Sequence, residues 1–531
     1  MSLWKVALAI VGAILSFILY ENRFDLCELP VLRNGCARSA NHSVAWKVLH
    51  HQGGNSPWFR KTDGVVDESY LPPNNCRVDQ VHMISRHAER YPTLLSGSRM
   101  LELYNRIHEE NVTLTGDLSF AMTWPFLTPD PDPPDAFFEN LISTGAHAGT
   151  LQAFTTGIKF RGRYRNLLDA SVAAKANDNE NRVINFWSSE APRVVETAKY
   201  FAAGFFGSDW ENHYVSSQHK PGQKSRPSYP AILNIIPTNP LHGADTLTPG
   251  KNCPNYYDRM SSNNTAAYLT GRVRAYQALF DFRSHFLPPI IARLEAQNPH
   301  FALSENEVYS MLELCGFDSI ASAEESGWTS PWCDVFTRQE WDAFEYARDV
   351  LHYYRSGPGS SFSNVLGRAW VNATTELLRL GPEQGSLFLS FAHDTDVLAI
   401  MTSLSLFEET APLPTTHMPH NRTFHTSSYL PMHGRLTVER LACPVERYCW
   451  SNAPFYPNHV YCSPERDEYF VRVNVNDGII ALPECKSGPG QSCPLSEFVG
   501  LMENKKDAGS FANACGLNDD VPERITFLKQ G

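Results

Sequence analysis

Residues 78–92 read VDQVHMISRHAERYP, and this stretch decides the fold. Its first half, residues 78–85, has the mixed apolar alternation of a β-strand. Arg86 and Arg90 follow at a spacing of four, so a helical turn there would place both on one face, with His87 between them in sequence. Two guanidiniums at a helix N-terminus favour a phosphate-like anion, and a neutral imidazole held beside that anion can attack phosphorus. The alternative is a solvated Arg/Glu helix start.

Two further strand ends carry polar side chains of the same kind. Residues 182–188 (RVINFWS) predict a strand, and the helix predicted after it has Arg193 in its first turn. Residues 387–391 (LFLSF) predict a short buried strand, followed at once by His393 and Asp394. Taken singly, Arg193 is typical of a surface residue and His393-Asp394 of a capping turn. Ligands bind at the carboxyl ends of strands in open α/β sheets, so the three strand ends together predict one anion site.

The rest of the chain predicts an α/β protein with a helical insertion. Further strands are expected at 435–441 and 468–475, and an extended crossing at 218–264. Helical spacing is found at residues 151–170, 193–206, 266–297, 305–314 and 338–354. The α/β core is expected from roughly 70–92, 180–210 and 380–480, and the helical part from roughly 93–180 and 265–360.

Composition narrows the range of functions. The chain has 531 residues, of which 42% are hydrophobic and 19% are charged, and these values are typical of a globular protein. Its formal net charge is −12, so a general affinity for nucleic acid is not expected. The sequence lacks the P-loop, the Gly-x-Ser-x-Gly nucleophile elbow and the His-Glu-x-x-His zinc motif, so none of these three chemistries is predicted.

The N-terminus indicates export. Lys5 precedes an apolar run at residues 6–20, which has the length of a long signal-peptide core and is short for a membrane span. Residues 1–21 are therefore expected to be a cleaved signal peptide or a retained signal anchor, and only an anchor would attach residues 22–531 to a membrane. The twelve cysteines include no Cys-x-x-Cys pair, so disulfides are expected. Candidate glycosylation sites begin at Asn41, Asn111, Asn263, Asn372 and Asn421.

The chain resembles the histidine acid phosphatases, in the branch of secreted fungal acid phosphatases and phytases. The family signature is Arg-His-Gly-x-Arg-x-Pro with a later His-Asp, and residues 86–92 and 393–394 are similar to it. Other similar stretches are RVVETAKYFAAGFF at 193–206, NEVYSMLELCGFDS at 306–319, SPWCDVFTRQEW at 330–341 and RLTVERLAC at 435–443. The resemblance covers nearly everything after residue 27. It implies a histidine phosphatase-like fold, in which a large α/β domain with a mixed central sheet carries a smaller inserted helical domain.

The resemblance also implies a role for each site residue. His87 would be the nucleophile that becomes phosphorylated, and Asp394 would protonate the leaving alcohol. The phosphate oxygens would be held by Arg86, Arg90, Arg193 and His393. The arginines supply the positive charge that phosphoryl transfer needs, so neither a metal nor another cofactor is implied. The expected partners are small-molecule phosphate monoesters.

A disulfide framework follows from the same resemblance. Matching positions imply the pairs Cys27–Cys36, Cys76–Cys443, Cys253–Cys515, Cys315–Cys333 and Cys485–Cys493. Cys449 and Cys462 remain as a further candidate pair.

Ala88 departs from the family signature, which has glycine at this position. A positive φ here would strain an alanine by about 1–2 kcal/mol. Because every charged role is still filled, we expect an active protein, in which Ala88→Gly leaves activity equal or higher.

Three functions are compatible with these residues. The main expectation is an exported, metal-independent acid phosphatase that hydrolyses phosphate monoesters through a phosphohistidine. The alternative is a phytase, although Glu89 beside the site and the net charge of −12 disfavour a polyanion such as inositol hexakisphosphate. Ala88 favours a third function, a catalytically weak phosphate-binding glycoprotein of the cell surface. The oligomeric state is left open.

Overall fold

The computed structural model describes most of the chain after residue 45. The described residues are 46–67, 69–109, 113–128, 133–175, 183–211, 229–257, 271–322, 327–445, 449–451, 460–462, 466–505 and 509–529. Among them, no helix combines the length and the apolar character needed to cross a membrane. The apolar run at 6–20 lies outside the described residues.

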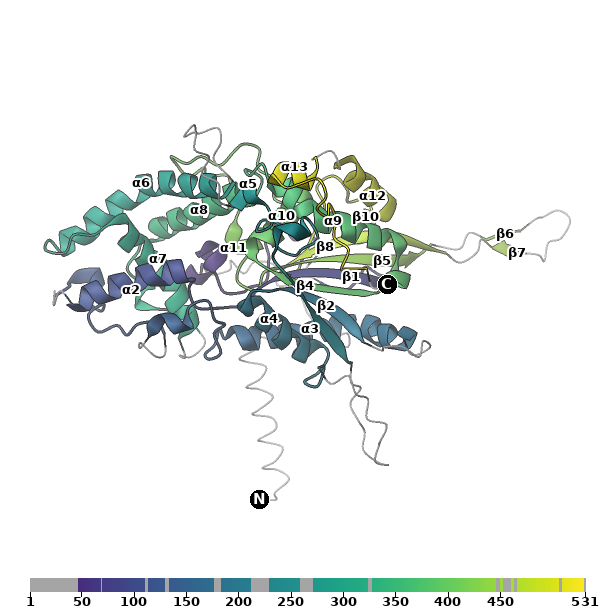
Figure 1. Ribbon diagram of the computed structural model, residues 1–531, viewed down its shortest axis with the longest axis horizontal. Helices are drawn as coiled ribbons and strands as arrows, with labels where there is room; N and C mark the ends of the chain where they lie inside the picture. Colours follow the sequence, from purple (N-terminus) through teal and green to yellow (C-terminus); the bar gives the residue numbers. More distant parts are fainter. Residues whose placement is uncertain are drawn as a thin grey trace, which may run out of the picture.

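A mixed central sheet organises the molecule (Figure 1). Its strand order is β10-β8-β5-β1-β4-β2-β3, and β9 pairs with β8. The strands are β1 (Arg77–Arg86), β2 (Ile184–Ser189), β3 (Ala231–Ile236), β4 (Leu387–Ala392), β5 (Arg435–Pro444), β8 (Asp467–Val475), β9 (Gly478–Ile480) and β10 (Cys493–Pro494). Strands β1, β4, β2 and β3 are parallel neighbours, whereas β5, β8, β9 and β10 pair antiparallel. The expected α/β fold with a mixed sheet is confirmed.

Alternation along the central strands sends side chains to two separate cores. In β4, Leu387, Leu389 and Phe391 face one core, and Phe388 faces the other. The imidazole of His82 on β1 stacks on Phe388 with ring centroids 4.4 Å apart. Both faces of these strands are therefore covered, as a parallel sheet requires.

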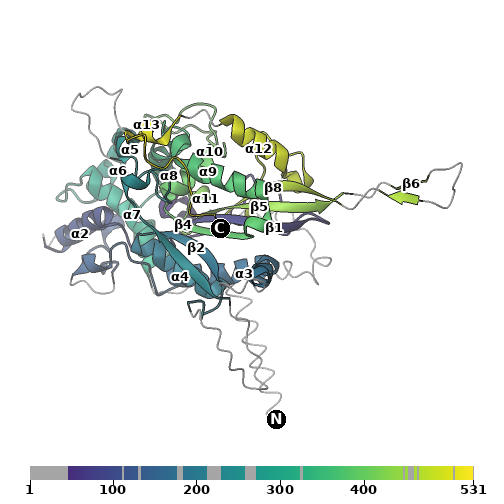
Figure 2. The same ribbon diagram turned by 45° about the vertical axis from the view of Figure 1, so that its right-hand side comes forward.

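The longer helices lie over the two faces of the sheet or beyond its end. The described ones are α2 (Leu94–Glu109), α3 (Gly149–Lys175), α4 (Pro192–Phe205), α5 (Pro254–Tyr257), α6 (Gly271–Gln297), α7 (Glu305–Ala321), α8 (Arg338–Arg355), α9 (Ser363–Leu380), α10 (Asp394–Ser403), α11 (Thr426–Tyr429), α12 (Leu495–Asn504) and α13 (Phe511–Cys515). Helices α9, α10 and α12 lie over one face of the sheet, and α2, α6, α7 and α8 lie together beyond its end (Figures 1 and 2). In this second group α6 packs against α8, and α2 packs against α7.

Helix α3 belongs to the α/β part of the molecule. The sequence-based division places residues from roughly 93 to 180, and so α3, in the helical part; α2, in the same range, packs against α7. Phe160 and Leu168 of α3 are buried in one core with Phe201 of α4 and the facing strand residues. Figures 1 and 2 show α3 and α4 together below the sheet. An apolar helix face is stabilised by whichever surface it covers, and its periodicity does not say which surface that is.

Four of the expected disulfides are present. They are Cys76–Cys443, Cys253–Cys515, Cys315–Cys333 and Cys485–Cys493. The pair Cys27–Cys36 lies outside the described residues. Cys449 and Cys462 are directly opposite each other in the small sheet formed by β6 (Cys449–Ser451) and β7 (Val460–Cys462).

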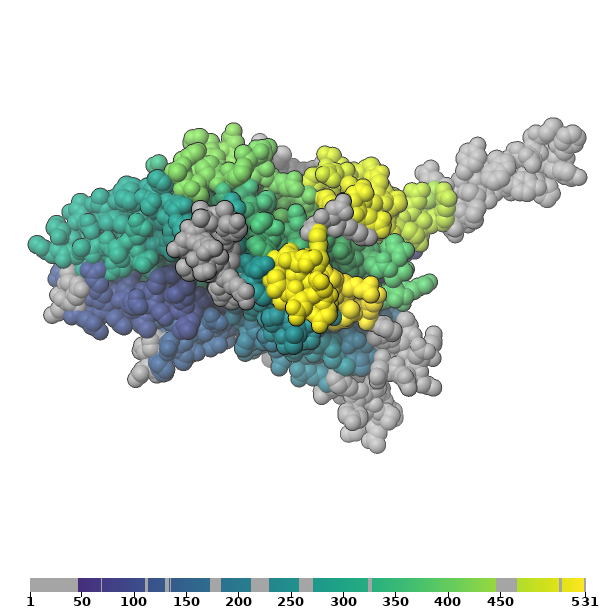
Figure 3. Space-filling view, turned by 45° about the horizontal axis from the view of Figure 1, so that its top comes forward, coloured from purple at the N-terminus to yellow at the C-terminus, as the bar shows by residue number. Residues whose placement is uncertain are grey.

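The C-terminal segment is fastened to the middle of the chain. Cys515 is bonded to Cys253, Ala244 donates its backbone N–H to the Pro522 carbonyl at 2.8 Å, and Thr526 donates its backbone N–H to Asp245. Figure 3 shows the C-terminal residues, in yellow, lying on the surface. These bonds keep residues far apart in sequence in a single unit.

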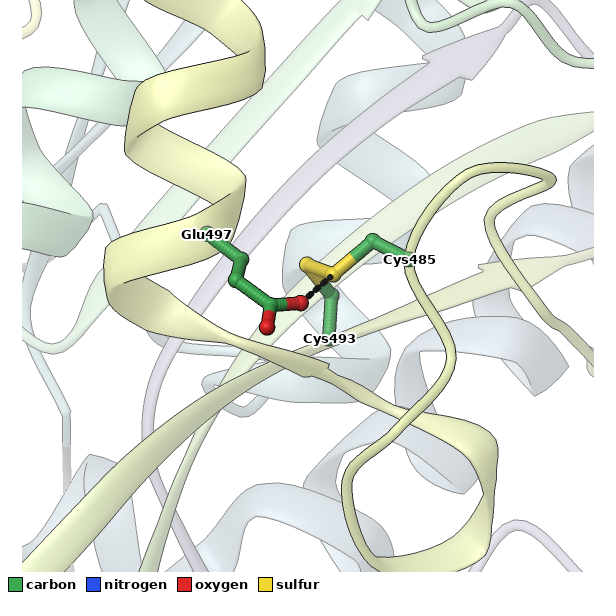
Figure 4. Close-up of side chains that lie close together, drawn as sticks. All are labelled: Cys485, Cys493 and Glu497. Carbon is green, nitrogen blue, oxygen red and sulfur yellow. Dashed lines mark hydrogen bonds between the residues drawn. A yellow bond between two sulfur atoms is a disulfide. The ribbon is translucent and has the colours of Figure 1, made fainter.

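One group of cysteine and acidic side chains has metal-ligand spacing. Cys485, Cys493 and Glu497 lie together, and Glu497 Oε2 is 3.0 Å from Cys485 Sγ (Figure 4). The two sulfurs are bonded to each other and so offer no thiolate to a cation. This cluster is a disulfide beside an exposed carboxylate.

Candidate active site

The three predicted strand ends meet at one edge of the sheet. β1 and β4 are parallel neighbours, and Arg86, the last residue of β1, pairs in register with Ala392. His393 and Asp394 come directly after β4. β2 is the next strand beyond β4, and Arg193 stands in the first turn of α4, just after β2. Parallel strands end at the same edge, so the register brings all four residues into one cavity.

The segment after β1 is a loop and not the helical turn considered from the sequence. Helix α2 begins only at Leu94, and Arg90 forms an isolated β-bridge with Leu141. Ala88 donates its backbone N–H to Thr197 Oγ1 at 3.0 Å, and Tyr91 donates its own to the Asn140 carbonyl at 3.0 Å. These partners take up backbone groups that a helix would otherwise pair internally. Arg86 and Arg90 converge because the loop folds back, not because of helical spacing.

His87 is held as a neutral imidazole with one nitrogen available. Its Nδ1 lies 2.9 Å from the Ala88 carbonyl, which can only accept, so Nδ1 carries the hydrogen and Nε2 keeps its lone pair. His87 is 2% exposed. Burial, followed by the charges of Arg86, Arg90 and Arg193, lowers the pKa of His87 well below its usual range. An unprotonated Nε2 therefore persists into acid solution.

Arginines surround that nitrogen. Arg90 Nε donates to His87 Nε2 at 3.4 Å, and Arg90 Nη1 donates to the Tyr91 carbonyl at 2.7 Å. Arg86 Nη1 donates to the Leu430 carbonyl at 2.7 Å, and Arg86 Nη2 lies 3.4 Å from Asp394 Oδ2. Burial and the neighbouring charges of Arg193 and Arg86 lower the pKa of Arg90 to about 9. Arg86, Arg90 and Arg193 thus form a cage of largely buried positive charge around His87, which a bound anion would stabilise.

His393 and Asp394 enter the cage from the N-terminus of α10. His393 donates its backbone N–H to Asp396 Oδ2 at 3.2 Å, and Thr395 donates its backbone N–H to Asp394 Oδ1 at 2.9 Å. The rings of His87 and His393 face each other edge to face, with centroids 6.0 Å apart. His393 Nε2 is buried with no hydrogen-bond partner among the described residues. Such a nitrogen can bind an oxygen of a ligand.

The cavity is lined by more basic residues than the sequence indicated. Its volume is about 980 Å³. Among the described residues, nine Arg or Lys side chains line it, against four carboxylates. The cations not predicted from the sequence are Arg99, Lys251, Arg272, Arg283, Arg348 and Arg355.

Helix α8 contributes cavity residues that sequence reasoning missed. Arg348, His352 and Arg355 follow one another at spacings of four and three, so they share one helix face. His352 is 1% exposed, although it lines the cavity. This spacing of basic residues, on a helix otherwise rich in aromatic residues, was the signal that could have identified them.

Glu89 points away from the cavity. Its Oε1 accepts a hydrogen bond from the Trp58 backbone N–H at 2.8 Å, and Glu89 does not line the cavity. Burial raises the pKa of Glu89 to about 7, so at acid pH the group is neutral. The sequence-based argument that Glu89 would repel a polyanionic substrate therefore loses its basis.

Ala88 fits the loop without strain. It does not have a positive φ, and its side chain is fully buried against Leu141 and Ala153. The strain considered for an alanine at this position is absent. The Ala88 methyl group instead fills space between the site loop and α3.

The fold and the site define a phosphatase-like α/β protein with a histidine at the end of its central strand. The sequence profile of the histidine phosphatase superfamily (branch 2) matches residues 77–476, and the chain belongs to this family.

Similar proteins cover almost the whole chain. It is 30% identical over 492 residues to the acid phosphatase PHO1 of Komagataella pastoris, which covers 91% of this chain and 90% of that protein. It is 28% identical over 482 residues to the phytase PHO112 of Candida albicans, with 91% and 90% covered. Among solved structures, the phytase from D. castellii superposes with a TM-score of 0.72 at 25% identity, covering 93% of this chain and 94% of that one.

Proposed function

We propose that the protein is an exported acid phosphatase that hydrolyses phosphate monoesters through a phosphohistidine and needs no metal. The observation that carries the proposal is the unprotonated Nε2 of His87, which accepts a hydrogen bond from Arg90 and is set among the charges of Arg86, Arg90 and Arg193. A nucleophile beside positive charge is what phosphoryl transfer requires, because its chemistry rests on positioning and charge stabilisation. The acid phosphatase and phytase names of its relatives support the same reaction class.

The first step transfers the phosphoryl group to the enzyme. His87 Nε2 attacks phosphorus, the N–P bond forms and the ester P–O bond breaks. The arginines bind the non-bridging oxygens, and Asp394 gives its proton to the leaving alcohol oxygen. The hydrogen bond from His87 Nδ1 to the Ala88 carbonyl stabilises the positive charge that develops on the phosphorylated ring.

The second step regenerates the enzyme. Water attacks phosphorus, its proton passes to the Asp394 carboxylate, and the N–P bond breaks. Inorganic phosphate leaves, His87 is again neutral, and Asp394 is again protonated, so the cycle is closed.

An acid optimum follows from the surroundings of Asp394. Burial alone would raise the pKa of this carboxyl, but Arg86, with His352 and Arg355, outweighs burial and holds it well below its usual range. A bound phosphate ester brings negative charge that offsets the guanidinium of Arg86, so the pKa of Asp394 rises when substrate binds. Low pH then favours the protonated acid in the complex, while burial keeps His87 neutral.

Phytase activity is the second candidate. The observation that favours it is the charge around a cavity of about 980 Å³, where the described lining residues include nine cationic side chains and four carboxylates. One phosphate group needs only the cations nearest His87, so the remaining arginines can bind further phosphates on the same substrate. The phytase from D. castellii, with its TM-score of 0.72, supports this candidate.

Export is supported by the disulfides. Four bonds join described cysteines, and such bonds persist in oxidising compartments. The candidate glycosylation site Asn421 is exposed, as a glycan acceptor must be, and Asn372 is partly exposed. Intact mass of the exported protein would show whether residues 1–21 are removed.

A parallel assay tests the proposal. Phosphate release from an aryl phosphate and from inositol hexakisphosphate is followed from acid to neutral pH, with a chelator present. We expect acid-optimal, chelator-resistant activity that falls at least about a thousandfold in His87→Ala. His417→Ala removes an exposed histidine outside the cavity and serves as the control. The ratio of the two substrates decides between acid phosphatase and phytase. No activity in a folded wild-type protein would favour the phosphate-binding glycoprotein.

A further inference from the structure

The carboxylate of Glu139 forms an ion pair with Arg193, one of the arginines proposed to bind phosphate. Its Oε2 is 2.8 Å from Arg193 Nη1. Burial, Arg193 and Arg86 lower the pKa of Arg90, and the charge of Glu139 opposes that shift, so its carboxylate acts on two arginines of the cage. Both Glu139 and Arg193 line the cavity.

The backbone around Glu139 is fixed to the loop that carries His87. Glu139 donates its backbone N–H to the Pro92 carbonyl at 2.9 Å, and its φ is +69°. The following residues pair with the same loop through the hydrogen bond from Tyr91 to Asn140 and the bridge between Arg90 and Leu141. The side chain therefore starts from a fixed point at the wall of the cage.

The side chain itself can leave the cage. Glu139 is 43% exposed, whereas Arg193 is 16% exposed. A phosphate dianion at the arginines and a carboxylate on the same guanidinium repel each other, because like charges at such distances are unfavourable. When phosphate binds, the exposed partner moves into solvent and the arginine stays.

We propose that Glu139 is an internal competitor for phosphate, which holds Arg193 in the empty enzyme and regains it when the product leaves. This inference rests on the proposed function, since it takes Arg193 to be a phosphate ligand. The consequence is that inorganic phosphate binds less tightly than it would to the cage without Glu139, so product inhibition is weaker.

A positioning role for Glu139 makes the opposite prediction. If the ion pair served to orient Arg193 toward phosphate, removing the carboxylate would loosen the guanidinium and weaken phosphate binding. If Glu139 competes, removing its charge strengthens phosphate binding. The sign of a single affinity change separates the two roles.

Calorimetric titration with inorganic phosphate measures that change without turnover. We expect Glu139→Gln to bind phosphate about three- to fivefold more tightly than wild type, the range of a partly exposed ion pair. The inhibition constant for phosphate should fall by the same factor. Glu376→Gln is the matched control, because Glu376 pairs with Arg379 at 2.8 Å and is 44% exposed, but does not line the cavity. Its phosphate affinity should equal that of wild type.

Two further variants keep the test decisive. Glu139→Asn also removes the charge, and asparagine tolerates the positive φ, so it replaces the glutamine variant if that one folds poorly. In an Arg193→Gln background, loss of Glu139 should improve phosphate binding less than it does in wild type, because the shared guanidinium is gone and only the effect of Glu139 on Arg90 remains. Unchanged or weaker phosphate binding in both Glu139 variants, or an equal gain without Arg193, would overturn the proposal. Failure of the proposed function would appear separately, as a wild-type protein that binds phosphate but does not hydrolyse monoesters.

Discussion

Two buried arginine clusters of this molecule differ in what neutralises them. Beneath the sheet, Arg435 and Arg163 share Asp477, at 2.7 and 3.1 Å. At the sheet edge, Arg86 and Arg90 donate mainly to backbone carbonyls. In the cage, Asp394 lies 3.4 Å from Arg86 and Glu139 pairs with Arg193, but Arg90 has no carboxylate partner among the described residues.

The difference shows in the pKa shifts of Arg163 and Arg90, whereas burial lowers the pKa of Arg435 as it lowers that of Arg90. The arginines lower the pKa of Asp477, and Asp477 raises the pKa of Arg163, although burial opposes both of these shifts. In the cage, burial and neighbouring cations lower the pKa of Arg90 to about 9. Similar side chains therefore build a stabilising network in one place and an anion site in the other. What marks function here is Arg90, a buried guanidinium without a paired carboxylate among the described residues, and not the presence of arginines alone.

Removing the carboxylate of the compensated cluster should have the largest effect on stability. Asp477→Asn leaves Arg435 and Arg163 buried without a counter-charge, so we expect the free energy of unfolding to fall by about 3–5 kcal/mol. Because Asp477 lies outside the cavity, kcat/KM of the folded protein should stay within about twofold of wild type. Denaturant unfolding and steady-state kinetics measure the two quantities. A loss of activity without a loss of stability would contradict the comparison.

Removing Arg90 from the cage should lower activity strongly and leave stability unchanged or higher. Arg90→Gln is expected to lower kcat/KM about 100- to 1000-fold, because a charge that stabilises the transition state is lost. Its Tm in phosphate-free buffer should equal or exceed that of wild type, because the substitution removes a buried positive charge that Arg193 and Arg86 repel. Steady-state kinetics and calorimetric melting measure the two quantities. A large drop in Tm would show that the charge of Arg90 is balanced in the folded protein and would contradict the comparison.

The cavity should also make the fold sensitive to acid. Burial lowers the pKa of His352 to about 3. The positive charges of Arg348 and Arg355 act in the same direction, and the charge of Asp394 opposes the shift. The unfolded chain, with an ordinary histidine pKa near about 6.5, then binds more protons between these two values, so stability is lost as pH falls below about 6.5. Between pH 6.5 and 4.5 the loss from this residue amounts to about 2–3 kcal/mol.

The matching variant is His352→Gln. Its free energy of unfolding, measured without phosphate at neutral and acid pH, should fall less steeply toward acid than that of wild type. Equal slopes for the two proteins would mean that His352 is protonated in the folded state.

The smallest effect is expected from Ala88→Gly, which alters the loop carrying His87 but removes no charged group. Ala88→Gly removes a methyl group packed against Leu141 and Ala153 and loosens the loop, so stability should fall by about 0.5–1 kcal/mol. We expect kcat/KM to be equal to or above the wild-type value, because every charged group remains. A large loss of kcat/KM would show that the loop has adapted to alanine.

Much of the site could be predicted because it lies at strand ends. Short apolar runs located β1, β2 and β4, and the polar residues after them are local in sequence. Parallel strands then bring His87, Arg193 and Asp394 into one cavity, as the rule for strand ends predicts. The path of the loop after β1 could not be predicted, because its backbone partners, such as Leu141, come from distant segments.

The misses are also physical. Helix α9 contains Gly367, a poor helix former, where a Cβ would lie 2.1 Å from the Ala399 carbonyl; this close approach of α9 and α10 is visible only in the fold. Strand β3, within the expected crossing at 218–264, is an edge strand with mixed burial and weak alternation. Helix α8 was predicted, but which of its faces lines the cavity depends on packing that the sequence does not specify.

The central claim is that His87 becomes phosphorylated. Turnover of a phosphate monoester would be stopped within milliseconds by denaturing alkali, in which phosphohistidine survives, and the peptide containing His87 analysed by mass spectrometry. The account predicts a peptide heavier by one phosphoryl group, with the modification on the imidazole and absent from His87→Ala. An unmodified His87 peptide during rapid turnover, or a phosphoryl group on another residue, would contradict it.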